Sequence, residues 1–350
     1  MKIASVMVAA ALLTAACGGG APGQGDAARP ATDILINGAG ATFPYPIYSK
    51  WFSEYNALHP DVRINYQSIG SGGGIRQLTN QTVFFGATDG PMTDDQLKAA
   101  PGPVLHFPTV LGAVVPVYNV PGVEGDLNFS GSVLADIYLG TVKKWNDPAL
   151  LTLNPGVKLP ATDITVVHRS DGSGTTFIFV DYLSKVSPAF KEKVGVATSV
   201  NWPTGVGGKG NEGVSGLVTQ TPGSIGYVEL IYAKQTKTAY GAVQNAAGEF
   251  IKASVEAVTA AAAEATANMP ADFRVSITNA PGKAAYPIAS FTWMLLFENP
   301  TDKAQSAAMV GFLKWALTDG QKGAVDLGYA PLPPSVIALE QAALARVKVS

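Results

Sequence analysis

Short apolar runs alternate along the chain with longer amphipathic stretches, a pattern typical of α/β proteins with strands and helices in separate layers. The runs expected to form strands are Ile34 to Ile36, Val62 to Tyr66, Val104 to Val117, Ile164 to Val167, Ile225 to Val228 and Ile288 to Phe297. The stretches expected to form helices are Pro46 to Leu58, Ile75 to Thr79, Val133 to Tyr138, Thr175 to Val186, Val255 to Ala265, Ala304 to Leu317 and Val336 to Val347. Thr93 and Gln96 have the spacing of a capping box and predict one more short helix.

The N-terminal segment has a different pattern and predicts export. Lys2 precedes an apolar run, Ile3 to Ala16, that is too short to cross a bilayer and ends in small residues, as secretory signals do. Cys17 follows the sequence Leu-Thr-Ala-Ala, which resembles a bacterial lipobox, the signal for lipidation of that cysteine. We expect a signal peptide over residues 1–17 and a protein of the periplasm or cell surface, membrane-anchored if Cys17 is lipidated. The alternative is an unprocessed cysteine in a folded core.

Residues 18–32 contain mostly Gly, Pro, Ala, Gln and Asp, which leave almost nothing to bury, so a flexible tether is expected there. The rest of the composition favours a compact protein with a small-molecule ligand. The chain has 350 residues, 47% of them hydrophobic, which is enough for two domains with a core each. A net charge of −2 provides no positive field for nucleic acid.

Glycine clusters recur where expected strands end and helices begin, and these are the positions at which open α/β sheets bind ligands. They are Gly38 to Gly40, Gly70 to Gly74 and Gly172 to Gly174. If the three loops converge, they line a single pocket.

The first two loops have features of anion sites. Before Pro44, glycines allow close approach of the backbone, and amides at a helix start lack intrahelical partners. Ser71 adds a hydroxyl donor to a second glycine-lined loop, an arrangement that suits an anion nest. The alternatives are a plain strand-to-helix turn at the first loop and a flexible surface loop at the second.

The third loop combines a guanidinium, two hydroxyls and helix-start amides. Arg169 can contact an oxyanion in a bidentate manner, and Ser173 and Thr175 lie where a helix begins. This density of donors favours a tetrahedral oxyanion. Asp171 could hold the guanidinium in place, although such a pair is often a solvated surface couple. Asp89 follows an apolar strand into a tight turn, where an aspartate is by default a turn or cap residue.

Together these segments resemble the phosphate-binding protein of the ABC-type phosphate transporter. The matching segments are Gly38 to Pro44, Gly70 to Gly74, Phe85 to Pro91, Arg169 to Thr175, Trp202 to Gly213 and Ile225 to Glu229, in the order of the family. The resemblance implies a two-lobed periplasmic binding protein fold of type II, with the ligand in the cleft between lobes. It also implies two hinge crossings, near Gly112 and Pro287, a discontinuous lobe I (residues 33–111 and 287–350) and a lobe II of residues 112–286.

The resemblance also implies the ligand and its partners. We expect the chain to bind inorganic phosphate without a cofactor or metal, to deliver it to the permease subunits of the transporter, and to be a monomer. The implied phosphate-binding residues are Thr42, Phe43, Ser71, Asp89, Arg169, Ser173, Gly174 and Thr175, with Asp171 in support. Gly72 stands where some relatives have a second serine.

In this set Asp89 is the single acceptor, and that explains a preference for phosphate over sulfate. At neutral pH phosphate keeps at least one proton, which an ionised carboxylate can accept, whereas a bare sulfate oxygen would face the carboxylate unpaired. A site for sulfate or molybdate would not need this acceptor. The sequence gives no strong reason for excluding arsenate.

Enzymes are the main alternative class, and the motifs do not favour them. No G-x-S-x-G elbow surrounds Ser71 or Ser173, and no H-E-x-x-H motif or cysteine pair is present. The three histidines, His59, His106 and His168, suggest no catalytic triad and are expected to be structural or exposed.

A nucleotide site is also not favoured. Gly205 to Asn211 resembles a phosphate loop superficially but lacks the required register. We expect it to be a loop that opens a helix over Glu212 to Gln220, with Lys209 exposed.

Overall fold

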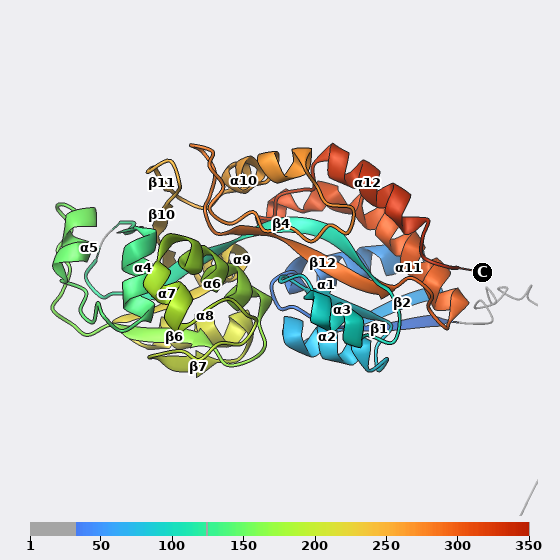
Figure 1. Ribbon diagram of the computed structural model, residues 1–350, viewed down its shortest axis with the longest axis horizontal. Coiled ribbons are helices and arrows are strands. Elements are labelled where there is room, and N and C mark those ends of the chain that lie inside the picture. Colours follow the sequence, from blue (N-terminus) through green and yellow to red (C-terminus); the bar gives the residue numbers. More distant parts are fainter. Residues whose placement is uncertain (1–32, 124, 350) are drawn as a thin grey trace, which may run out of the picture. The chain divides into compact units, whose positions relative to one another are not determined.

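The computed structural model describes residues 33–123 and 125–349 and consists of helices packed on a mixed sheet (Figure 1). The strands are β1 (Ile34–Gly40), β2 (Val62–Ser68), β3 (Phe85–Thr88), β4 (Val104–Asn119), β5 (Asn128–Phe129), β6 (Thr165–Arg169), β7 (Val206–Gly208), β8 (Ser224–Glu229), β9 (Ala239–Tyr240), β10 (Ala242–Gln244), β11 (Phe250–Ile251) and β12 (Ala289–Phe297). The α-helices are α1 (Tyr45–Leu58), α2 (Ser71–Thr79), α3 (Asp94–Ala99), α4 (Gly131–Tyr138), α5 (Pro148–Leu153), α6 (Gly174–Val186), α7 (Pro188–Lys193), α8 (Gly210–Gln220), α9 (Leu230–Thr236), α10 (Val255–Ala267), α11 (Lys303–Ala316) and α12 (Pro334–Leu344).

One sheet connects two groups of parallel strands. Its order is β2-β1-β3-β12-β4-β8-β6-β7, with β9 paired to β4, and β5, β10 and β11 form a second small sheet. β1 pairs in parallel with β2 and β3 on one side, and β6 pairs in parallel with β7 and β8 on the other. The antiparallel strands β4 and β12 run between the two groups (Figure 1). The loops that follow β1, β2, β3 and β6 contribute the residues discussed below.

The long strand β4 changes its partner in the middle. It pairs with β12 from Val104 to Ala113 and with β8 from Val114 to Asn119. The change occurs next to Gly112, whose missing side chain makes room for a ring: a Cβ there would lie 2.6 Å from the ring of Phe43. β12 itself begins at Ala289, and its neighbour Ile288 accepts a hydrogen bond from the Val114 amide at 2.9 Å.

The predicted α/β class and every strand and helix expected from the apolar pattern are confirmed, with ends that differ by a few residues. The short elements β5, α5, α7, α9 and β9 to β11 were not predicted, because runs this short carry too little periodicity. Two expectations were wrong in detail. Val206 to Gly208, expected to be part of a loop, forms β7, because it extends the sheet beside β6. The final helix ends at Leu344 rather than at Val347.

The second glycine cluster is part of a helix and not a loop, because α2 begins at Ser71 and includes Gly72 to Gly74. Close packing on β1 and β3 explains these helix-disfavouring residues. A Cβ on Gly74 would lie 2.5 Å from the Gly40 Cα and 2.8 Å from the Ala87 carbonyl oxygen. Backbone atoms cannot move aside as a side chain can, so glycine is required for α2 to approach the sheet.

The core of the first group of strands is aromatic. One face of α1 buries Tyr48, Trp51, Phe52 and Tyr55, which follow the helical spacing of three and four residues. The Trp51 indole donates a hydrogen bond to the Gly320 carbonyl at 2.8 Å, so its polar group is satisfied inside the core.

Several predicted features lie outside the described residues: the signal peptide over 1–17, the tether over 18–32 and lipidation of Cys17. Among the helices that the structure describes, none is both long and apolar enough to cross a membrane.

Replacing Gly74 with alanine tests the close packing of α2. We expect Gly74→Ala to lower the free energy of unfolding by about 1–3 kcal/mol, because the new methyl group overpacks against backbone. Gly216→Ala in α8 is the matched control, since a Cβ there would have nothing within 4 Å. It should raise stability by about 0.5–1 kcal/mol through helix propensity. Urea unfolding measures both, and equal stabilities of the two variants would contradict the packing argument.

Candidate anion-binding site

The structure brings the eight predicted phosphate-binding residues together at the starts of three helices and the ends of two strands. Thr42 and Phe43 precede α1, Ser71 begins α2, and Ser173 to Thr175 begin α6. The remaining two, Asp89 and Arg169, lie at the ends of β3 and β6. None of the eight is exposed: residue exposure is 4% for Arg169, 2% for Thr42 and 1% or less for Ser71 and Asp89. The positive ends of these helix dipoles favour a negative charge where the starts meet.

Ser71 joins the two groups of strands. Its Oγ accepts a hydrogen bond from the Asp89 amide at 3.2 Å and another from the Gly174 amide at 3.0 Å. Its hydroxyl proton is directed to Asp89 Oδ2 at 3.4 Å. Close by, the Gly72 amide donates to the Gly172 carbonyl at 2.9 Å. These bonds hold the start of α2 directly against the start of α6.

Gly174 forms a wall of this site where no side chain fits. A Cβ on Gly174 would lie 2.5 Å from both Asp89 Oδ2 and Ser71 Oγ. Nonbonded contacts of a Cβ essentially never fall below 3.0 Å, so a glycine suits the close meeting of the two helix starts.

Arg169 is fixed by a two-point contact with Asp171. Its Nε donates to Oδ1 at 2.8 Å and its Nη2 to Oδ2 at 2.5 Å, with the Arg169 side chain 1% exposed and that of Asp171 13% exposed. The pair is therefore buried and is not a solvated surface couple. Burial opposes ionisation of Asp171, but the hydrogen bonds and charge of Arg169 lower the pKa of this carboxyl below its usual value. The Gly210 amide adds a third bond to Asp171 at 3.0 Å.

Asn211 connects two of the hydroxyls across the site. Its Nδ2 donates to Thr42 Oγ1 at 2.7 Å and to Thr175 Oγ1 at 3.1 Å. Its backbone amide also points to Thr42 Oγ1, at 3.3 Å. Thr175 Oγ1 accepts a further bond from Arg169 Nη1 at 3.3 Å.

Not all of the predicted donors are available to a ligand in the same way. The Ser173 amide donates to the Thr198 carbonyl at 2.7 Å, and the Ser173 Oγ caps α6 by accepting from the Thr176 amide at 3.0 Å. Of the two donors of Ser173, only the hydroxyl proton is therefore free. The Gly174 amide is bonded to Ser71, as described above.

Four other amides have no hydrogen-bond partner among residues 33–123 and 125–349. They belong to the buried residues Thr42, Phe43, Ser71 and Thr175. Buried amides are nearly always paired, and an unpaired one costs about 1–3 kcal/mol. Four of them around one point are suited to an anion that accepts several hydrogen bonds.

Asp89 is the acceptor that faces this ring of donors. Thr292 Oγ1 donates to Asp89 Oδ1 at 2.7 Å, which leaves Oδ2 toward Ser71 and Gly174. Burial raises the pKa of Asp89 to about 7, against the lowering effects of the Thr292 bond, the Arg169 charge and the Ser71 bond. The carboxyl group therefore changes its charge near neutral pH.

Two residues of the site were not predicted. Asn211 lies at the start of α8, in a segment that we had compared only with a nucleotide loop and with the wider resemblance. Thr292 lies inside β12, where a threonine is indistinguishable from an ordinary strand residue. The three histidines lie elsewhere: His106 is buried and accepts from the Met92 amide at 3.1 Å, His168 stacks on Trp202, and His59 is exposed.

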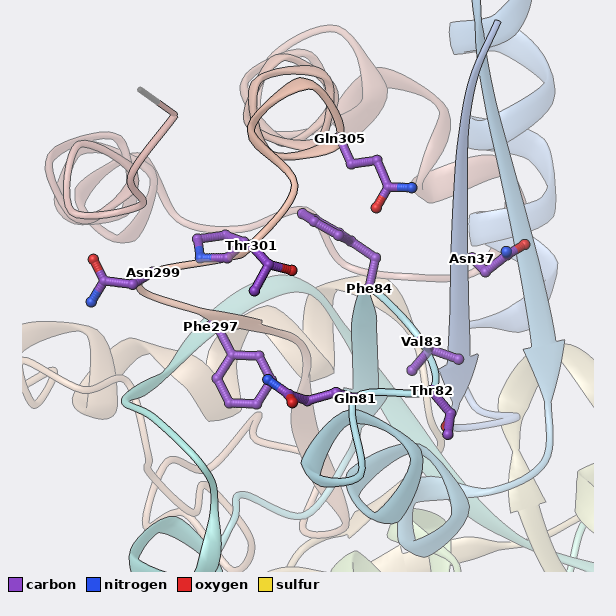
Figure 2. Close-up of a pocket in the computed structure, with 10 residues that line it drawn as sticks. Asn37, Gln81, Thr82, Val83, Phe84, Phe297, Asn299, Thr301 and Gln305 are labelled. Atoms are coloured by element: carbon purple, nitrogen blue, oxygen red, sulfur yellow. The ribbon is translucent and has the colours of Figure 1, made fainter.

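A separate recess of about 240 Å³ differs from this site in its chemistry (Figure 2). Its lining includes the amide side chains of Asn37, Gln81 and Gln305 and the rings of Phe84 and Phe297, and it contains no charged residue. Thr301 and Gln305 of this lining flank the start of α11, but no guanidinium or ammonium group lines the recess. None of the predicted phosphate-binding residues lines it.

Comparisons with known proteins agree with the fold and the site. A family model described as a PBP superfamily domain matches residues 19–320. The chain is 50% identical over 311 residues to the phosphate-binding protein PstS of Xylella fastidiosa, covering 89% of this chain and 85% of the relative. It is 40% identical over 345 residues to the PstS of Methanocaldococcus jannaschii, covering 92% and 88%.

Solved structures with the same fold have lower identity. A phosphate ABC transporter substrate-binding protein with bound phosphate from Clostridium perfringens has a TM-score of 0.63 at 16% identity, covering 85% of this chain and all of that one. A high-affinity periplasmic phosphate-binding protein bound with phosphate has a TM-score of 0.69 at 21% identity, covering 88% and 93%. The two-lobed periplasmic binding protein fold expected from the sequence is therefore confirmed. The chain belongs to the PBP superfamily and, within it, to the family of the phosphate-binding protein PstS.

Proposed function

We propose that this protein binds inorganic phosphate outside the cytoplasmic membrane and delivers it to the permease of an ABC-type phosphate importer. The observation that carries the proposal is the set of four unpaired, buried amides at the starts of α1, α2 and α6, where Arg169 and Asp89 bond to residues of the same helix starts. Its relatives are named phosphate-binding proteins, and two solved neighbours were described with bound phosphate. The chain is thus a carrier of its ligand, and we assign it no catalytic role.

In this proposal every group around the phosphate except one is a donor. The unpaired amides of Thr42, Phe43, Ser71 and Thr175 and the hydroxyls of Thr42, Ser173 and Thr175 donate to phosphate oxygens. Arg169 adds charge-assisted bonds, which are about twice as strong as neutral ones. The guanidinium is already held by Asp171, so little side-chain entropy is lost when the ligand binds.

Asp89 provides the selectivity. As a carboxylate it accepts the proton of a P–OH group, whereas a sulfate oxygen offers no proton and is repelled. An unsatisfied buried group costs about 1–3 kcal/mol, which corresponds to about tenfold to hundredfold discrimination. Sulfate and molybdate sites would have no use for this acceptor.

Closure of two lobes completes the site. We assign residues 33–111 and 287–350 to lobe I and residues 112–286 to lobe II, with crossings near Gly112 and Pro287. Along β4 the pairing partner changes from β12 to β8 next to Gly112, and this change supports the first crossing. The bonds of Ser71 to Gly174 and of Asn211 to Thr42 then join the lobes around the ligand. A closed form stabilised by its ligand is a state that a permease can recognise.

Arg169→Ala should weaken phosphate binding by about 2–5 kcal/mol, because one partner of a buried charge-assisted contact is lost and Asp171 is left unpaired. Calorimetric titration measures the change. Arg346→Ala is the control, since the Arg346 side chain is 50% exposed and bonded only to Glu298 at the surface. Full affinity of the Arg169 variant would remove this residue from the site.

The charge of Asp89 predicts how selectivity depends on pH. The pKa of Asp89 is raised to about 7. Above that pH the carboxylate repels sulfate; below it the neutral acid can donate to a sulfate oxygen. The ratio of phosphate to sulfate affinity should therefore fall by about tenfold or more between pH 8.5 and pH 5.5. In Asp89→Asn this pH dependence should be smaller, because only the titration of phosphate itself remains, and the selectivity at pH 8.5 should be reduced.

The same titrations test the function itself. Phosphate should bind and raise the melting temperature, sulfate should do neither at pH 8.5, and phosphomonoesters should remain unhydrolysed. If the wild-type protein does not bind phosphate, the proposed function is wrong. If phosphate binds but selectivity does not change with pH, only the role of Asp89 is wrong.

We also propose that the exported protein is tethered through a lipid on Cys17 and acts as a monomer. The support is the lipobox-like sequence before the cysteine and the polar, glycine-rich residues 18–32 that follow it. Metabolic labelling with a fatty-acid analogue should mark the wild-type protein and should not mark Cys17→Ala, which should be released from the membrane fraction. Equal labelling of both would contradict a lipid at this position.

A further inference from the structure

Asn211 is among the most completely bonded side chains of the site. It is fully buried, and its Oδ1 accepts from the Glu229 backbone amide at 2.9 Å. A backbone N–H can only donate, so the oxygen of the Asn211 amide must face Glu229 and the NH₂ group must face Thr42 and Thr175. This bond fixes which way the amide points.

The orientation of Asn211 determines what the two threonines can do. A hydroxyl has two acceptor positions and one proton. Both positions of Thr42 Oγ1 are occupied by N–H groups of Asn211. Those of Thr175 Oγ1 are occupied by Asn211 Nδ2 and Arg169 Nη1. The only hydrogen bond left to either hydroxyl is one that it donates itself.

We propose that Asn211 is a positioning residue that makes the hydroxyls of Thr42 and Thr175 obligate donors and so determines the hydrogen-bond polarity of the site. The inference rests on the proposed function, because it specifies how the phosphate oxygens are recognised. Without Asn211 each threonine could rotate and present a lone pair to the ligand, and Asp89 would no longer be the only acceptor.

The charged groups around Asn211 are consistent with this role. Arg169 and Asp89 lie on the ligand side, and Glu229 lies behind Asn211 on β8. Burial raises the pKa of Glu229 well above its usual value, which disfavours a negative charge behind the site. The Glu229 Oε2 accepts from the Ile231 amide at 2.7 Å, a bond that caps α9 and holds this strand end in place.

A mutant cycle in the full-length protein tests the proposal. Asn211→Leu keeps the size of the side chain and removes its donors, and the Thr42→Val/Thr175→Val variant removes the hydroxyls on which Asn211 acts. Phosphate affinity should fall by about 10- to 100-fold in Asn211→Leu. In the double-valine background the same leucine substitution should change phosphate affinity by less than about threefold, because the two hydroxyls that Asn211 orients are absent.

The pH dependence of phosphate affinity distinguishes a role of Asn211 in orienting the hydroxyls from a role in packing alone. In Asn211→Leu the freed lone pairs can accept a proton from the ligand, so the more protonated phosphate monoanion gains relative to the dianion. The ratio of affinity at pH 5.5 to affinity at pH 8.5 should rise by about three- to tenfold relative to the wild-type ratio. Asn154→Leu is the control, because Asn154 is an equally buried asparagine that bonds to Asn128 and Leu150. It should lower stability and leave both readouts unchanged.

The outcomes distinguish the two proposals. Additive losses in the cycle, or an unchanged pH ratio, overturn the role of Asn211 while the wild-type protein still binds phosphate. Absence of binding by the wild-type protein overturns the proposed function instead. If the leucine variant does not fold, Asn211→Asp replaces it in the test. The aspartate retains an acceptor for the Glu229 amide but cannot donate to both threonines. It should show the same loss and the same direction of pH shift.

Discussion

A buried hydroxyl oxygen that already accepts two hydrogen bonds can interact with a ligand only by donating its proton. At this site the constraint applies to Thr42 and Thr175, whose acceptor positions are all occupied by N–H groups of the protein. Ser71 Oγ also accepts two N–H bonds, and its proton is directed to Asp89. With the unpaired amides and the guanidinium of Arg169, the constraint gives a surface of donors and leaves one acceptor, Asp89. Recognition of an anion and of the hydrogen that it carries then follow from the same arrangement.

The fold makes this arrangement possible by directing several helix starts to one place. Parallel strands on either side of the β4 and β12 pair end toward the site, and α1, α2 and α6 begin there. The approach is close because the chain has glycine where backbones meet, as at Gly74 against the sheet and at Gly172 against Gly72. Burial then strengthens every polar interaction, including the ion pair of Arg169 with Asp171, by excluding water.

Much of this could be predicted from the sequence, because the relevant signals are local. Strands and helices follow from apolar periodicity, and the glycine clusters mark the segments next to Ser71 and Arg169. The start of α2 was missed because three glycines oppose a helix by local propensity, and only packing against the sheet compensates. Asn211 and Thr292 were not recognised, since their importance depends on Thr42 and Asp89, which lie 169 and 203 residues away in the sequence, and no local pattern reveals such pairs.

The glycine at position 174 also limits how the site can change during evolution. Binding proteins commonly adapt to a larger ligand by shortening a side chain in the pocket wall. Here the wall opposite Asp89 and Ser71 is backbone, and a residue without a side chain has nothing to shorten. Point mutations at this position can only make the space smaller, so on this side of the site room for a bulkier anion requires a displacement of the start of α6.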